Sequence, residues 1–294
     1  MGLDATGLAA VSLFRAEGPL GHTLTLGRQR LACRPATLKA WGVQQDLFDS
    51  EWADSIFLDH LGSKSLASID ASGYEGASLL SDLNEPIPSE LSGSFDSIID
   101  LGTTEHIFDV HQAFLNIRDM CKVDGRILHV LPTNQQSGHG LYQFSPEFFF
   151  SLYSRSNGFS STSVYVSSLR HPLKWMALEP PHGGRRISIW SRHPTNIIVI
   201  TTLVARKHLS VNQSDYVTAW HEQREISRES SNLKSTLKSV RWIHTLGLWT
   251  RRVHLQLRRL FSDPVVEAYG LSTTHVNPRA VVEERFGFNS SSSQ

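Results

Sequence analysis

Cysteine is scarce in this sequence, neither sign of charge is in excess, and no long apolar run occurs. The 294 residues include two cysteines, which lie far apart and outside any C-x-x-C pair. A disulfide framework and a thiolate zinc site are therefore excluded, and a reducing, cytoplasmic compartment is expected. Lysine plus arginine and aspartate plus glutamate both number 28, so net charge gives no indication of nucleic-acid binding. No apolar stretch reaches the roughly 18 residues of a transmembrane helix.

Two motifs that would indicate a particular reaction are also missing. No G-x-G-x-x-G follows the first predicted strand, which argues against a nicotinamide-dependent oxidoreductase. The 14 histidines include no H-E-x-x-H, so the sequence predicts no metal site, and one would have to be assembled in three dimensions. Residues 1–20 lack the regions of a signal peptide and are expected to form an N-terminal segment.

Short β-rich runs alternate with helix-like stretches between residues 21 and 210. The seven predicted strands cover residues 22–26, 65–69, 77–81, 95–101, 126–131, 162–166 and 196–204. Helices are predicted over residues 36–48, 107–121 and 145–157, with an extra one near 50–62. This alternation predicts a wound α/β sheet with helices on both faces. Residues 169–194, rich in Pro, Gly, His and Arg, are predicted to be a loop insertion.

A basic, helical pattern occupies residues 211–262, and residues 263–294 are expected to form a C-terminal tail. Apolar residues share one helical face between 242 and 260, and basic residues flank it between 234 and 259. Such a helical extension could lie on an anionic membrane surface. It could equally pack on the sheet domain or self-associate through residues 234–261. Nucleic acid is not favoured as its partner, because no aromatic residues interleave with the basic face.

Glycines and acids follow the predicted strands. In an open α/β sheet, ligands bind beyond the carboxyl ends of the strands. Gly27 follows the first strand, where the missing side chain would let a ligand approach the backbone. Asp70 ends the second strand, where an acid can accept hydrogen bonds from both hydroxyls of a ribose. These positions predict a nucleotide-like ligand at this edge.

Several short segments, taken in order, resemble class I methyltransferases that use S-adenosylmethionine. FDSIID at 95–100 is similar to the family's FD-hydrophobic fourth strand, and EHIFD at 105–109 to its LEHV-x-D helix start. KVDGR at 122–126 is similar to the KPGG turn, with Arg126 in place of the second glycine. Stretches at 70–77, 82–84 and 138–149 resemble a bacterial methyltransferase-like subgroup. The first loop departs from the family, because it has Gly27 alone, followed by Arg-Gln-Arg.

The resemblance, which covers roughly residues 20–206, implies a Rossmann-like seven-stranded methyltransferase sheet and S-adenosyl-L-methionine as cofactor. It implies that Asp70 binds the ribose and that Asp82 and Leu83 contact adenine. The full set of expected cofactor-binding residues is Gly27, Arg28, Asp70, Ala71, Asp82, Leu83, Asp100 and Gly102.

Methyl transfer from a sulfonium is a direct displacement, so positioning supplies most of the catalysis. A base near a hydroxyl or amine acceptor would help. His139, Glu105 and His106 are the candidates: His139 lies in a glycine-flanked loop after the fifth strand. For each, a structural role is the alternative. Glu105 would favour the helix dipole in a first turn, His106 would cap or pack, and His139 would hydrogen-bond to hold its loop open.

The sequence therefore predicts a cytoplasmic methyltransferase acting on a small-molecule or glycan-like acceptor, with the membrane periphery as an alternative location. The rival hypothesis is a catalytically inactive methyltransferase-like scaffold that acts through its basic C-terminal helix.

Overall fold

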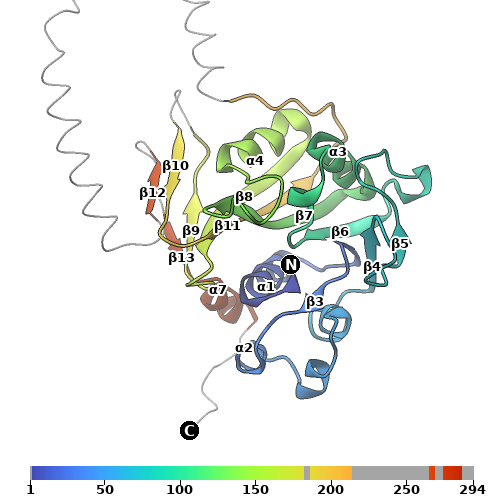
Figure 1. Cartoon of the computed structure of the whole chain (residues 1–294), viewed down its shortest axis with the longest axis vertical. Helices are drawn as coiled ribbons and strands as arrows, with labels where there is room; N and C mark the ends of the chain where they lie inside the picture. Colours follow the sequence, from blue (N-terminus) through green and yellow to red (C-terminus); the bar gives the residue numbers. More distant parts are fainter. Residues whose placement is uncertain (1, 182–185, 214–264, 269–273, 287–294) are drawn as a thin grey trace, which may run out of the picture.

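A nine-stranded mixed sheet forms the centre of the molecule in the computed structural model, which describes residues 2–181, 186–213, 265–268 and 274–286 (Figure 1). The strand order is β13-β9-β8-β11-β7-β6-β2-β4-β5. The strands of this sheet are β2 (His22–Leu26), β4 (Ser65–Asp70), β5 (Leu79–Leu80), β6 (Phe95–Asp100), β7 (Cys121–Asn134), β8 (Phe159–Ser168), β9 (Trp175–Leu178), β11 (Thr195–Leu203) and β13 (Thr274–Val276).

The central part of the sheet is wound in two directions from β2. Strands β5, β4, β2, β6 and β7 pair in parallel in that order, which is the 3-2-1-4-5 order of the Rossmann fold. β11 then pairs antiparallel with both β7 and β8. The chain changes direction across the sheet between β2 and β6, and the ends of these two strands define the crevice where a ligand is expected. The predicted Rossmann-like fold and its seven strands are confirmed.

Neighbouring residues along a strand point to opposite faces of the sheet, and an apolar core covers each face. Ile98, for example, belongs to one apolar cluster with α3 (Val110–Met120) and α4 (Pro146–Leu152). Its neighbour Ile99 belongs to a second cluster with α1 (Ala5–Glu17) and α2 (Pro35–Ala40). Figure 1 shows α3 and α4 on one side of the sheet and α1 on the other.

The predicted helices occur, with changes in length. Ser145 caps α4, because its hydroxyl accepts a hydrogen bond from the Phe148 amide at 3.3 Å. The helix expected over 36–48 ends at Ala40, since Gly42 has a φ of +72°; the 3-10 turn η1 (Gln45–Phe48) follows. In the region of the extra helix, the structure has one π-helical turn, η2 (Ile56–His60). Three further 3-10 turns are η3 (Ser89–Leu91), η4 (Thr104–His106) and η5 (Arg155–Asn157).

The structure adds elements in three regions for which the sequence suggested none. The N-terminal segment contains α1, buried without interruption from Thr6 to Phe14, so it shows no amphipathic period. In place of the loop expected over 169–194, there are β9 and β10 (Ile187–Trp190). The expected tail contains β12 (Val265–Ala268), β13 and α7 (Pro278–Phe286). β12 pairs with β10, and β13 with β9, and such long-range pairing leaves no local sequence signal. Two short strands, β1 (Gly2–Leu3) and β3 (Arg30–Leu31), form a separate parallel pair.

The predicted basic helical extension lies outside the described residues, apart from 211–213. Within the described part of the chain, no helix combines the length and apolarity that a membrane crossing requires.

Candidate active site

The loop after β2 forms one side of the crevice. Gly27 is buried and has a φ of +67°, a left-handed conformation that favours glycine. A Cβ atom built there would lie 3.9 Å from Oδ2 of Asp70 and 3.3 Å from Oγ1 of Thr103. Gly27 therefore lies where the ends of β2, β4 and β6 approach one another.

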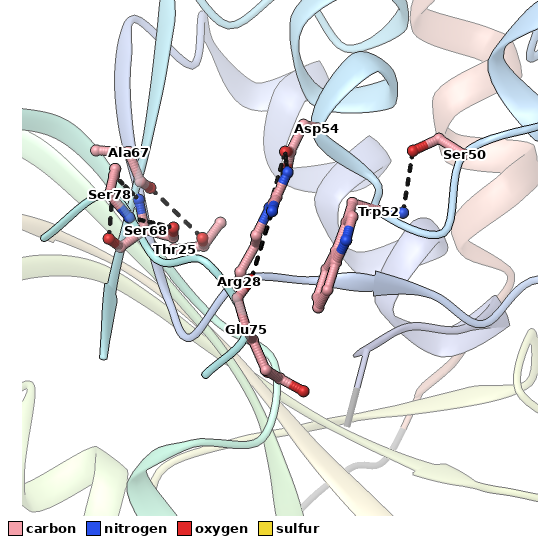
Figure 2. Close-up of polar contacts among 9 residues, drawn as sticks. All are labelled: Thr25, Arg28, Ser50, Trp52, Asp54, Ala67, Ser68, Glu75 and Ser78. Atoms are coloured by element: carbon pink, nitrogen blue, oxygen red, sulfur yellow. Dashed lines mark hydrogen bonds and ion pairs between the residues drawn. The ribbon is translucent and has the colours of Figure 1, made fainter. Parts of the chain in front are cut away.

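Asp70 ends β4 and is half-buried beside Gly27. Its Oδ1 accepts a hydrogen bond from the Ser72 amide at 3.0 Å. The loop that follows is closed by Ser68 and Ser78, whose amides each donate to the other's hydroxyl at 2.9 and 3.2 Å (Figure 2). The loop thus has a fixed base, and Oδ2 of Asp70 faces Gly27.

Arg28 is held against the segment inserted before β4. Its guanidinium donates to Asp54 at 3.0 and 2.6 Å and lies 4.6 Å from the Trp52 ring centroid. It also donates to the Glu75 carbonyl at 3.4 Å, which links it to the loop after β4 (Figure 2). The positive charge of Arg28 is paired inside the protein, so this side chain shapes the crevice wall.

Gln29 stabilises the turn at Gly27 from beneath. The side chain is buried, and its Nε2 donates to the carbonyls of Leu26 and Gly27 at 2.9 and 3.0 Å. A side-chain amide therefore fixes the turn in a loop that has a single glycine.

Asp100, at the end of β6, belongs to a buried polar network. Its carboxylate accepts hydrogen bonds from the Thr103 amide, the Thr104 hydroxyl and Nδ1 of His129. The other ring nitrogen of His129 lies 2.6 Å from the Tyr153 hydroxyl, which donates to it. Burial raises the pKa of Tyr153 well above its ordinary value. Since Asp100 is fully buried and its oxygens are occupied, it supports the turn after β6 from inside.

The turn after β6 buries Glu105, whose carboxylate has no hydrogen-bond partner among the described residues. The Thr103 hydroxyl anchors the turn by donating to the Leu26 carbonyl at 2.8 Å. Glu105 is completely buried, and neither carboxylate oxygen accepts a hydrogen bond from a described residue. Burial, with the Asp100 carboxylate as a further cause, raises the pKa of Glu105 to about 8.

His139 is brought to Glu105 by the loop between β7 and α4. The amides of Leu141 and Tyr142 both donate to the Glu105 carbonyl, at 2.8 and 3.2 Å. A Cβ atom at Gly140 would lie 2.7 Å from the Glu105 Cγ, so only glycine fits there. As a result, Nε2 of His139 lies 3.3 Å from Oε1 of Glu105.

His106 completes the cluster. Its Nε2 lies 3.8 Å from Oε1 of Glu105, and its ring centroid lies 5.5 Å from that of His139. Burial lowers the pKa of both histidines, and in His106 the neighbouring His139 lowers it further. The three residues predicted to be catalytic are therefore side by side in the fold.

The other predicted cofactor residues have varied positions. Asp82 is exposed after β5, where hydrogen bonds from Asn84 lower its pKa. Leu83 is 4% exposed and packs in the apolar cluster under α3. Ala71 is exposed in the loop after Asp70, and Gly102 is buried with a φ of +96°.

Sequence reasoning missed three residues that shape the crevice. Thr103 joins the β6 turn to β2, Gln29 supports the Gly27 turn, and Asp54 pairs with Arg28. Gln29, two residues after the lone strand-end Gly27, is a usable sequence signal, because a side-chain amide at that position can bind the carbonyls of the turn. Asp54 gave none, because it contacts Arg28 through tertiary packing alone.

Comparison with known proteins gives matches among solved structures only. No protein-family model and no curated protein matches the chain. The chain is similar to a 1,6-didemethyltoxoflavin-N1-methyltransferase of Burkholderia thailandensis, solved with S-adenosylhomocysteine, at 13% identity and a TM-score of 0.40 over 68% of this chain and 79% of that one. It is similar to a SAM-dependent methyltransferase of Thermotoga maritima at 16% identity and a TM-score of 0.38, over 66% of this chain and 88% of that one. It is also similar to a branched-chain polyamine synthase of Thermus thermophilus, solved with 5'-methylthioadenosine. The identity is 12% and the TM-score 0.37, over 71% of this chain and 58% of that one.

Proposed function

We propose that this protein is an S-adenosylmethionine-dependent methyltransferase that acts on a small-molecule acceptor by direct displacement. One observation carries the proposal: Gly27 and Asp70 follow β2 and β4, and the cluster of Glu105, His106 and His139 follows β6 and β7, all beside the switch point of a Rossmann-like sheet. This is where a doubly wound sheet binds its ligand. The sequence resemblance to class I methyltransferases supports the same assignment.

The cofactor side of the crevice consists of Gly27 and Asp70. Oδ1 of Asp70 is held by the Ser72 amide, and Oδ2 points toward Gly27, where it can accept hydrogen bonds from ribose hydroxyls. The left-handed glycine keeps the space beside the carboxylate clear of a side chain. Asp82, after the next strand, is proposed to contact the adenine, whereas the buried Leu83 supports the wall from the core.

The acceptor side consists of Glu105, His106 and His139. Bound at Gly27 and Asp70, S-adenosylmethionine would supply an electrophilic methyl group, with the neutral thioether as its leaving group. A hydroxyl or amine acceptor loses a proton, and polar groups beside the nucleophile assist that loss. The side chain of His139 is 32% exposed, so it can meet an acceptor entering from solvent while it contacts the buried Glu105.

Calorimetric titration of the full chain with S-adenosylmethionine and S-adenosylhomocysteine tests the proposal. We expect binding in the micromolar range. Asp70→Ala should weaken it by about 1–3 kcal/mol, because ribose hydroxyls lose a charged acceptor. Asp46→Ala, which removes an exposed carboxylate in η1, is the matched control and should bind as the parent does. No binding at millimolar ligand would refute the proposed function, and unchanged affinity in Asp70→Ala would refute the assigned ribose site.

A further inference from the structure

Three metal-ligand side chains meet in the crevice although the sequence predicted no metal site. A carboxylate oxygen of Glu105 and one ring nitrogen each of His106 and His139 all lie within 4.8 Å of one another. The oxygen-to-nitrogen distances are 3.3 Å to His139 and 3.8 Å to His106. With metal–ligand bonds of about 2.0–2.1 Å, two ligands of a tetrahedral ion are separated by about 3.4 Å. The spacing of the cluster is close to that of a coordination sphere.

The cluster also lacks the hydrogen bonds that a purely structural role would provide. Glu105 is 0% exposed, and both of its carboxylate oxygens lack a hydrogen-bond partner among the described residues. Nε2 of His139 is likewise buried without one. Buried polar groups are nearly always hydrogen-bonded or coordinate a metal, because leaving them unpaired costs free energy.

The surrounding structure makes the site both preformed and accessible. The backbone of Glu105 is fixed by the Leu141 and Tyr142 amides, which hold the His139 loop in place. The buried Asp100, at the end of β6 and five residues before Glu105, adds negative charge that favours a cation. The side chain of His106 is 48% exposed, so an ion can enter from the histidine side.

We propose that Glu105, His106 and His139 bind a divalent first-row transition-metal ion such as Zn²⁺. Two imidazoles and one carboxylate suit such ions better than they suit Mg²⁺ or Ca²⁺, which prefer all-oxygen sites. Three protein ligands leave open positions, as in catalytic metal sites. We further infer that the methyl acceptor binds at those open positions, and only this part of the inference rests on the proposed function. Binding of the ion itself does not depend on the reaction.

Metal titration of the full chain tests the proposal. The protein is stripped with a chelator, dialysed and titrated with Zn²⁺ by calorimetry, and Co²⁺ serves as a spectroscopic probe of the coordination. We expect one ion per chain at this site and a Co²⁺ spectrum of low coordination number. No binding of either ion at millimolar concentration would overturn the proposal.

Variants locate the site, because the chain has other histidines, some outside the described residues. His106→Ala and His139→Ala should each weaken Zn²⁺ binding by at least about 100-fold, since even a second-shell change costs about 10- to 100-fold. Glu105→Gln, which keeps the shape of the side chain, should do the same without loss of folding. His111→Ala, at an exposed position on α3, is the control and should leave binding unchanged.

Circular dichroism of each variant separates loss of the site from loss of folding. Folded variants that still bind Zn²⁺ as the parent does would show that the cluster is an acid–base group without a metal, and would overturn the proposal. Failure of the metal site and failure of the proposed function are distinguishable. Zn²⁺ binding without S-adenosylmethionine binding would leave the ion site standing and refute the methyltransferase, whereas the reverse result would refute the ion site alone.

Discussion

At the scale of single residues, the crevice depends on close approaches that only glycine permits. Gly140 touches the backbone and side chain of Glu105, where a Cβ atom would come within 2.7 Å of Cγ and 2.9 Å of the carbonyl oxygen. Gly138, two residues earlier in the same loop, has nothing within 4 Å of the same position. The two glycines therefore form a natural pair for comparison.

We expect Gly140→Ala to displace the His139 loop from Glu105 and to destabilise the protein by about 1–3 kcal/mol, as overpacking does. Methyl transfer should fall with it, because the His139 contact is lost. Thermal unfolding and an activity assay on the two alanine variants measure this. Gly138→Ala should behave as the parent protein, and equal effects of the two substitutions would contradict the assigned contact.

Sequence patterns identified the catalytic candidates at this scale but not how they are arranged. Glu105 and His106 follow a strand and His139 lies in the next such loop, which suggests the same sheet edge. Their approach to within 4.8 Å of one another depends on the amides of residues 141 and 142, which bind the Glu105 carbonyl. Asp100 differs from these three residues. Its position at a strand end also suggested ligand binding, but its carboxylate faces His129 in the core.

At the scale of elements, Arg126 joins the first helix to the middle of the sheet. Its guanidinium donates to the carbonyls of Phe14, Gly18 and Pro19 at 2.6, 2.7 and 2.9 Å. It also lies 4.1 Å from the Phe14 ring centroid. Arg126 therefore binds carbonyl groups at the C-terminal end of α1, which ends at Glu17 with Gly18 as its C-cap residue.

We expect Arg126→Ala to lower the free energy of unfolding by at least about 2 kcal/mol, since hydrogen bonds to charged groups each contribute about 1.5–3 kcal/mol. Arg126→Lys should recover only part of this, because an ammonium cannot span three carbonyls as a guanidinium does. Denaturant unfolding measures both. Arg155→Ala, at an exposed position in η5, is the control; a loss no greater than the control's would contradict the capping role.

At the scale of the whole molecule, Asp96 connects three strands of the sheet. Its carboxylate accepts hydrogen bonds from the His22 amide at the start of β2 and from Lys122 on β7, at 2.8 and 2.7 Å. Partial burial alone would raise the pKa of Asp96, but the hydrogen bonds from Lys122 and His22 outweigh it and hold the pKa below its ordinary value.

A carboxyl whose pKa is lower in the folded protein stabilises the fold above its unfolded pKa, and the contribution is lost as pH falls through the folded pKa. Asp96→Asn should therefore reduce stability at pH 7. The difference from the parent should shrink as the pH is lowered below about 4. Thermal unfolding from pH 7 to pH 2 measures the difference, with Asp46→Asn as control. A difference that is constant over this range would contradict the role of the charge.

The two ends of the described chain also meet at this scale. α7 packs against α1, with Val282 7% exposed and Arg285 donating to the Ala16 carbonyl at 3.1 Å. The α7 part of the predicted C-terminal tail thus packs on the first helix. The parts of the basic extension between 214 and 262 lie outside the described residues, so the membrane and scaffold hypotheses stay predictions.

The sequence by itself determined the Rossmann-like sheet, its seven main strands and the strand ends that carry the site. These features depend on local periodicity and on turn chemistry, which each segment carries within itself. The strands β9, β10, β12 and β13 were decided by pairing between distant segments. The tertiary structure also decided the meeting of Glu105, His106 and His139. Three side chains from two loops come within ion-binding distance only when the sheet and the backbone amides hold those loops together.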